Sequence, residues 1–92
     1  MLIEFDSVKR ALTLQNRGLD FTRAVEVFAG KHLSKIDSRT DYAEPRTITA
    51  GWLDGRIIVM VWTPRGAARR IISMRKANER EINAIGDALD ES

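Results

Sequence analysis

The sequence contains no cysteine and only one histidine, His32, and these two shortages narrow the chemistry open to its side chains. Without cysteine, disulfides, thiolate metal ligands and a thiol nucleophile are all excluded. The lone histidine has no second imidazole with which to share a metal ion. We therefore expect no metal site and no cofactor.

Long apolar runs are also missing. No stretch approaches the roughly 20 residues that a membrane-spanning helix needs. The first residues, MLIEFD, lack the basic region and the long apolar region of a signal peptide. These two absences predict a cytoplasmic protein with no membrane partner.

No repeat or linker divides the 92 residues, and a chain of this length can bury one modest core. We expect a single domain over residues 1–92. The 43% hydrophobic and 30% charged residues are typical of a soluble globular protein.

The net charge of +2 hides an uneven distribution. Residues 1–45 carry seven basic and seven acidic side chains, residues 46–80 carry eight basic and two acidic ones, and residues 81–92 carry four acids alone. Seven of the eight basic residues are arginine, whose planar fork grips phosphate better than lysine does. The pattern predicts a polyanion surface beside an acidic tail, and the alternative is a set of solvated surface charges.

Helical patterns fill most of the first 30 residues, after a short strand that residues 2–5 can form. Asp6 or Ser7 can cap a helix over about residues 8–17, and Gly18 ends it. The inward positions of this helix are predicted to be Val8, Ala11, Leu12 and Leu14.

A second helix is predicted between Asp20, its cap, and Gly30, its end. Its apolar residues follow the spacing i, i+3, i+4, i+7 of a single stripe facing the core. They are Phe21, Ala24, Val25 and Phe28.

Strand patterns dominate from residue 31 to residue 76, over residues 31–38, 46–52, 57–62 and 69–76. Asp54-Gly55 is a strong hairpin signal, and a second turn is predicted at residues 63–66, where Pro64 suits the first central position. Residues 57–62 are apolar on both faces and should form the central strand.

A final helix is predicted from Asn78, which has capping-box spacing to Glu81. Its apolar residues Ile82, Ile85 and Leu89 face either the core or a partner. The predicted fold class is α+β, with N-terminal helices, an antiparallel four-stranded meander and a C-terminal helix.

The alternation of the last strand separates its side chains into two sets. One face is predicted to carry Ile71, Ser73 and Arg75, and the other Arg70, Ile72, Met74 and Lys76. Arg75 beside Ser73 is the leading candidate for a phosphate clamp. Arg70 and Lys76 reach the same site only if the strand twists or bulges.

Several segments, in order along nearly the whole chain, resemble the BrnT toxin family. They are Phe5-Asp6 with Lys9, GLDF at 18–21 with Ala24 and Val27-Phe28, DSR at 37–39, DY at 41–42, EPR at 44–46, DGR at 54–56, TPRG at 63–66 and RIISMRKA at 70–77. Residues 70–77 are the most specific of these. One departure is Arg17, because many members of the family have histidine before the glycine at this helix end.

This resemblance implies a RelE-like fold and a ribonuclease toxin of a type II toxin–antitoxin system that arrests translation and growth. It also implies two partners. The first is messenger RNA, free or on the ribosome. The second is a BrnA-type antitoxin that neutralises the toxin in a hetero-oligomer and, with it, binds their operator DNA.

Metal-free cleavage of RNA uses the 2′-hydroxyl as an internal nucleophile, so it needs proton removal, charge stabilisation at phosphorus and a proton for the leaving oxygen. Arginine supplies the second task. The predicted catalytic residues are Arg75, Arg46, Glu44 and Lys76. The predicted RNA-binding residues are Lys9, Tyr42, Arg65 and Arg70.

Each of these residues also has a plainer interpretation. Glu44, before Pro45, is either a general base or the ion-pair partner of Arg46, and His32 is more often a surface residue. Two other functions stay open: a degenerate homologue that only binds antitoxin or RNA, and a small DNA-binding regulator. The latter is disfavoured because the basic residues fall on strands and turns instead of a recognition helix.

Overall fold

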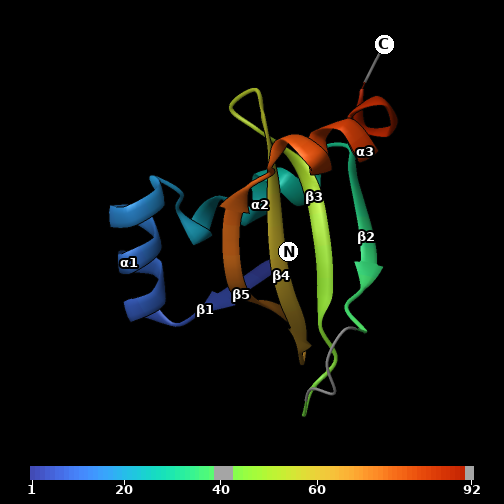
Figure 1. The fold of residues 1–92 in the computed structure, drawn as a ribbon. Coiled ribbons are helices and arrows are strands. Elements are labelled where there is room, and N and C mark those ends of the chain that lie inside the picture. Colours follow the sequence, from blue (N-terminus) through green and yellow to red (C-terminus); the bar gives the residue numbers. More distant parts are fainter. Residues whose placement is uncertain (39–42, 91–92) are drawn as a thin grey trace.

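Residues 1–38 and 43–90 are described by the structure, a computed structural model (Figure 1). The elements are, in chain order, β1 (Leu2–Phe5), α1 (Ser7–Arg17), the 3₁₀ turn η1 (Phe21–Arg23), α2 (Ala24–Ala29), β2 (His32–Ile36), β3 (Thr47–Leu53), β4 (Arg56–Arg65), β5 (Ala68–Lys76) and α3 (Glu79–Leu89). The α+β class is confirmed. Tyr42, with Asp41, lies outside the described residues.

The sheet has five strands in the order β1-β5-β4-β3-β2. Its last four strands form the predicted antiparallel meander, but β1 adds to β5 in parallel, from Leu2 beside Ala68 to Phe5 beside Ile71. The prediction of a purely antiparallel, four-stranded sheet is therefore wrong. A four-residue strand that pairs with a partner more than 60 positions away leaves no turn signal in the sequence.

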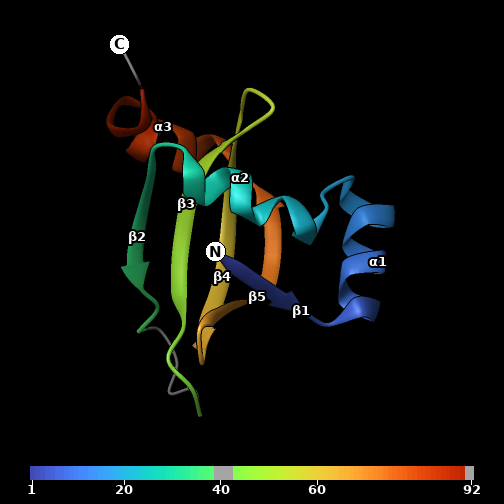
Figure 2. The same cartoon turned by 180° about the vertical axis from the view of Figure 1, so that it is seen from behind.

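Helices cover both faces of this sheet. We call the side under η1 and α2 the α2 face, and its core includes Phe21, Val27, Met60, Ile71 and Met74. The opposite side is the α3 face, where α3 crosses one end of the sheet (Figures 1 and 2).

The core beneath α3 contains Ala50, Ile57, Val59 and Leu89. Four successive residues of β4, Ile57 to Met60, are buried, which confirms it as the doubly covered central strand. The sequence left open whether α3 closes the core or binds a partner. Leu89 is fully buried and Ile85 packs on the same cluster, so these two close the core, whereas Ile82 stays 44% exposed.

The first helix lies beside the sheet instead of over it. No residue of α1 is buried, and Val8 and Leu12 are 66% and 51% exposed, so the predicted inward stripe is wrong. The helix stands next to β5 (Figure 2). It is held there by polar contacts: Arg10 forms an ion pair with Asp20 (2.8 Å), and Arg17 Nη1 donates to the carbonyl of Met74 (2.9 Å).

The apolar stripe after Asp20 is shifted by one local irregularity. Phe21, Ala24 and Phe28 are buried as predicted, but Val27 is buried and Val25 is 40% exposed. The segment begins as the 3₁₀ turn η1, with three residues per turn, which changes the phase of the α-helix that follows.

One of the two predicted turns is confirmed. Asp54 and Gly55 both adopt positive φ (52° and 75°), as a two-residue hairpin turn requires. The turn predicted at residues 63–66 is wrong, because Thr63, Pro64 and Arg65 continue β4 as far as the pairing of Arg65 with Ala68. The left-handed residue that makes this turn is Gly66 (φ 59°), so glycine sets its position and proline does not.

Among the described residues, no helix has both the length and the apolar character needed to cross a membrane.

Two glycine-to-alanine changes should have opposite effects on stability. A Cβ at Gly51 would lie 2.8 Å from Cγ1 of Val27 and 3.0 Å from Cβ of His32. We expect Gly51→Ala to lower the free energy of unfolding by about 1–3 kcal/mol through overpacking. Gly86, in α3, has room for a Cβ, and Gly86→Ala should raise stability by up to about 1 kcal/mol. Chemical denaturation checks both, and equal effects would contradict the packing described here.

Candidate functional site

An irregularity in β5 decides which of its side chains share a face. Val61 pairs with Ser73 but Trp62 pairs with Ile71, so Ile72 is an extra residue, a β-bulge. The alternation of side chains between the two faces shifts by one residue there, so Ile71 and Met74 both enter the α2-face core. The prediction that Ile71 shares the face of Ser73 and Arg75 is therefore wrong.

The same bulge brings Arg70 to the α3 face. Glu4 is the neighbour of Arg70 on β1, and the residues on either side of it, Ile3 and Phe5, pack on the α2-face core. Because side chains alternate along a strand, Glu4 and its neighbour Arg70 point to the α3 face. Arg75 pairs with Val59, whose side chain belongs to the α3-face core. Arg70, Ser73 and Arg75 consequently line one face.

Lys76 takes the opposite side. It pairs with Ile58, which is buried in the α2-face core, and it lines a pocket there with Arg17 and Arg56. The predicted catalytic pair of Arg75 and Lys76 is therefore divided between the two faces of the sheet, as alternation requires of neighbouring strand residues.

Arg75 is held by a carboxylate from α3. Its two terminal nitrogens donate to the two oxygens of Glu81 at 2.7 and 2.8 Å. The pKa of Glu81 is lowered from 4.5 to about 2, chiefly by the hydrogen bonds from Arg75 and also by that from the amide of Asn78, against the opposing effect of partial burial. Glu81 also completes the capping box with Asn78, so one side chain both starts α3 and orients Arg75.

Arg70 has a comparable partner at the other end of β5. Its Nη1 donates to Glu4 of β1 at 2.8 Å. The nearby cap of α1, Asp6, has its pKa lowered by the amides of Lys9 and Val8 and, more weakly, by the charges of Lys9 and Arg70. The start of α1 therefore brings Lys9 close to Arg70.

A groove of about 270 Å³ separates α1 from β5 between these two arginines. Lys9, Asn16 and Arg17 line it from the helix, and Ile72 and Ser73 line it from the strand. The bulge thus contributes to the floor of the groove. Arg17 uses its guanidinium to hold α1 against the carbonyl of Met74.

Arg65 and Glu44 lie away from Arg75. Arg46 comes just before β3 and accepts a backbone hydrogen bond from Asp37 through its carbonyl (2.8 Å). Arg65 ends β4, and its Nη2 is 3.5 Å from Glu44. Val59, beside Arg75, is six positions from Arg65 along β4, which is about 20 Å. The predicted site residues thus form two groups.

His32 lies in neither group. Its Nδ1 is 2.8 Å from the carbonyl of Gly30, and its ring packs edge-on against Phe28 on the α2 face. The side chain predicted to be on the surface is half-buried. Within the described ranges, no three His, Asp or Glu side chains gather as a metal-ligating group.

The carboxylates that hold Arg70 and Arg75 were not predicted from the sequence. Glu81 was recognised only as a helix-capping residue, although its place next to a strand ending in Arg75 could have suggested the ion pair. Glu4 carries no comparable signal, because its contact with Arg70 depends on the parallel pairing of β1.

Comparison with protein families now adds a finding to this geometry. The model of a family described as the ribonuclease toxin, BrnT, of type II toxin–antitoxin systems matches residues 5–81. The chain belongs to the BrnT family. The match includes Arg70 and Arg75 and ends at Glu81. None of the curated proteins compared with the chain is a significant match.

Membership places the chain among ribonuclease toxins and gives it two kinds of partner, an RNA substrate and an antitoxin. The resemblance noted from residues 70–77 is confirmed. A ribonuclease needs cationic groups that can bind the phosphates of RNA. On the α3 face and its groove, such groups are the guanidiniums of arginine, which can bind phosphate through two parallel hydrogen bonds.

The Arg75–Glu81 pair should make stability depend on pH. Because the pKa of Glu81 is lowered on folding, the pair stabilises the protein above pH 4.5, and this stabilisation is lost as the pH falls toward 2. Glu81→Gln keeps a capping side chain but removes the charge. We expect the variant to be less stable at pH 6 by about 1 kcal/mol or less, since the pair is partly exposed. Urea denaturation should show this difference vanish near pH 2, and a difference independent of pH would contradict the pair.

Proposed function

We propose that this chain is a metal-independent endoribonuclease that cleaves messenger RNA on its α3 face and so arrests translation. The observation that carries the proposal is the bulge at Ile72, which gathers Arg70, Ser73 and Arg75 beside the groove of α1. A cytoplasmic location and a RelE-like fold belong to the same proposal.

The reaction would proceed by attack of the RNA's own 2′-hydroxyl on the adjacent phosphorus. A bond forms between O2′ and phosphorus, the bond from phosphorus to O5′ breaks, and the 2′ proton leaves to a base while O5′ gains a proton. Arg75 would stabilise the extra negative charge on the phosphorane through its planar fork. Arg70 and Lys9 would hold neighbouring phosphates along the groove.

RNA must compete with carboxylates for these arginines. Glu81 engages both terminal nitrogens of Arg75, and Glu4 engages Arg70. Both pairs are partly exposed, so exchanging a carboxylate for a phosphate does not require the core to open. Substrate binding would thereby release Glu81 from the contact that lowers its pKa and make it a better proton acceptor.

Glu44, the general base suggested by the sequence, would serve chemistry at a different place on the sheet. It pairs with Arg65, whose backbone is about 20 Å along the sheet from that of Arg75, which separates it from a phosphate that Arg75 holds. Chemistry centred on Arg75 and chemistry centred on Arg46 and Glu44 are therefore separate hypotheses. The position of Arg75 beside the groove favours the first.

Substitutions separate the two hypotheses. We expect Arg75→Ala to lose at least about 100-fold in cleavage of a defined transcript in EDTA, as expected when a group that stabilises a developing oxyanion is removed. Glu44→Gln and Arg46→Ala should lose much less.

Arg80→Ala, which removes an exposed arginine of α3, is the charge-matched control and should cleave normally. If Arg75→Ala cleaves normally and Glu44→Gln loses activity, the reaction takes place near Glu44 and the proposal for Arg75 is wrong. Wild-type protein that binds RNA and antitoxin without cleaving, in EDTA or with added Mg²⁺, would instead support the degenerate homologue.

A BrnA-type antitoxin is the proposed protein partner, forming a hetero-oligomer that binds operator DNA through the antitoxin. Such a partner needs apolar surface that the toxin leaves open. Val8 and Leu12, one turn apart on α1, are more exposed than Ile82 of α3. Because Ile85 and Leu89 close the toxin's own core, α1 is the better docking helix for the antitoxin.

A matched pair of variants tests this surface. We expect Leu12→Lys to weaken antitoxin binding at least about tenfold, because it places a charge in an apolar contact. Ile82→Lys makes the same change on α3 and should have little effect. Both sites are exposed, so both variants should fold. Calorimetric titration with the antitoxin would show the reverse order if α3 were the docking helix.

A further inference from the structure

A second basic pocket, of about 560 Å³, lies on the α2 side of the sheet, where α1 ends and the turn between β3 and β4 projects. Arg17, η1, and the adjoining ends of β4 and β5 form its walls. Its charged lining residues are Arg17, Arg23, Arg56, Lys76, Asp20 and Asp54. The bulge places Lys76 here, away from Arg75.

Both acidic residues of this pocket are already bound by an arginine. Arg23 binds both oxygens of Asp54 and also forms an ion pair with Glu26, and the pKa of Asp54 is lowered by these hydrogen bonds. Asp20 accepts two hydrogen bonds from Arg10, at 2.8 and 3.0 Å, which hold its pKa far below the usual range. Asp20 is therefore neutralised by Arg10, whereas Arg23 serves two carboxylates. Glu26 and Asp54 together keep one negative charge, which acts on the nearby Arg56.

Three further cations line the pocket, and they outnumber the one negative charge that the Arg23 cluster keeps. Arg17 donates to a neutral carbonyl, that of Met74, so its charge is not cancelled. Among the described residues, Arg56 and Lys76 form no hydrogen bond or ion pair through their side chains, and both are exposed. Three cations around one hollow attract an anion more strongly than isolated surface charges do.

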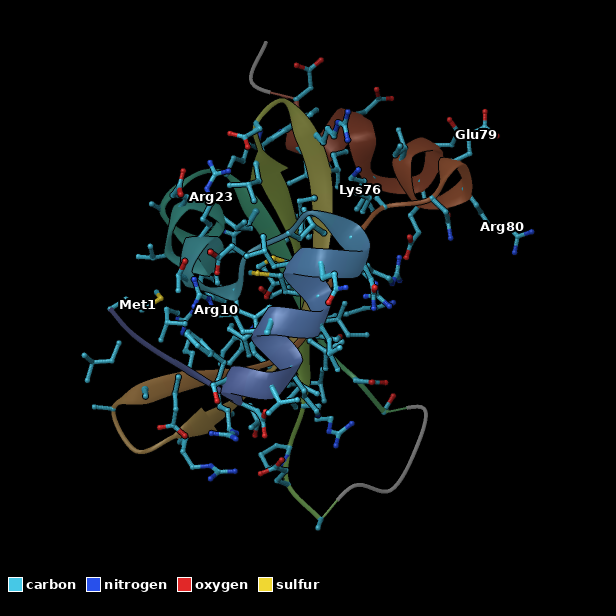
Figure 3. The ribbon with its side chains drawn as sticks, turned by 90° about the vertical axis from the view of Figure 1, so that its left-hand side faces the viewer. Met1, Arg10, Arg23, Lys76, Glu79 and Arg80 are labelled. Atoms are coloured by element: carbon cyan, nitrogen blue, oxygen red, sulfur yellow. The ribbon has the colours of Figure 1, made fainter. Side chains whose placement is uncertain are left out.

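The strand geometry places two of these cations side by side. Arg56 and Ile58 are two positions apart on β4, and Ile58 pairs with Lys76 on β5. Arg56 and Lys76 are therefore diagonal neighbours on one face, with backbones about 7–8 Å apart. Figure 3 shows Lys76 above α1. Their spacing suits two successive charges of one extended polyanion.

We propose that this pocket is a second phosphodiester-binding site, which holds the RNA strand beyond the cleaved linkage. Because Arg75 and Lys76 are consecutive, a strand that leaves the α3 face at Arg75 needs only to pass around the end of β5 to reach Lys76 and Arg56. Lys76 then serves affinity for long RNA and takes no part in the chemistry. This inference rests on the proposed function for the identity of its ligand.

The test measures binding of two 2′-O-methyl RNA oligonucleotides, which carry backbone charge but lack the attacking hydroxyl. One has about 15 nucleotides, within the length that single-strand sites span, and one has about three. We expect Arg56→Ala/Lys76→Ala to bind the long oligonucleotide at least about tenfold more weakly. The slope of log K against log salt should fall by about 1.4, as for two lost contacts. Binding of the short oligonucleotide should change less than about twofold.

Arg80→Ala removes one exposed positive charge from α3 and is the control, expected to change neither affinity. Unchanged binding of the long oligonucleotide by the double variant would overturn the second site. So would an equal loss for both oligonucleotides, or an equal loss with Arg80→Ala, because each indicates only general attraction.

Cleavage of a short substrate distinguishes this site from the catalytic one. The double variant should cleave the short substrate with the wild-type kcat. A lower kcat would indicate that Lys76 takes part in the chemistry and would overturn its assignment to the second site. If wild-type protein binds the long oligonucleotide through Arg56 and Lys76 but cleaves no RNA, the second site stands and the proposed nuclease function fails.

Discussion

One extra residue in β5 determines how this protein presents its charge. With strict alternation along β5, Arg70 would leave the face of Arg75, and the buried side of the strand would lose either Ile71 or Met74. The bulge at Ile72 lets both apolar residues enter one core and lets both arginines face the other way. The same irregularity therefore serves both the burial of apolar residues and the proposed function. Beside it, β1 extends the sheet and α1 forms one wall of the groove.

The arginines of the α3 face are held by carboxylates from opposite ends of the chain. Glu4 comes from β1 and Glu81 from α3, so Arg70 and Arg75 are oriented only when the whole sheet is assembled. Each pair is partly open to solvent, which limits what it adds to stability and allows a phosphate to take the carboxylate's place. The resting pairs would thus keep the cations in position for RNA without fixing them permanently.

Local signals in the sequence were sufficient for much of the fold. Asp6, Gly18, Asp54-Gly55 and the capping box at Asn78 mark element ends because each satisfies a backbone requirement of its own neighbourhood. Non-local effects were not predictable in the same way. The pairing of β1 with β5, the bulge and the exposure of α1 all depend on contacts between distant segments. For the candidate site, arginine-rich β5 was recognised, but its partners Glu4 and Glu81 and the division of Arg75 from Lys76 required the assembled sheet.

The central claim is that phosphate binds where the bulge gathers Arg70, Ser73 and Arg75. A nuclear magnetic resonance titration of the wild-type protein with a non-cleavable trinucleotide addresses it most directly, because a short ligand reports the highest-affinity phosphate site. We expect the largest amide shifts on β5 between residues 70 and 75 and on the first turns of α1 and α3. Shifts concentrated instead around Glu44 and Arg46, or spread evenly over all basic residues, would contradict it.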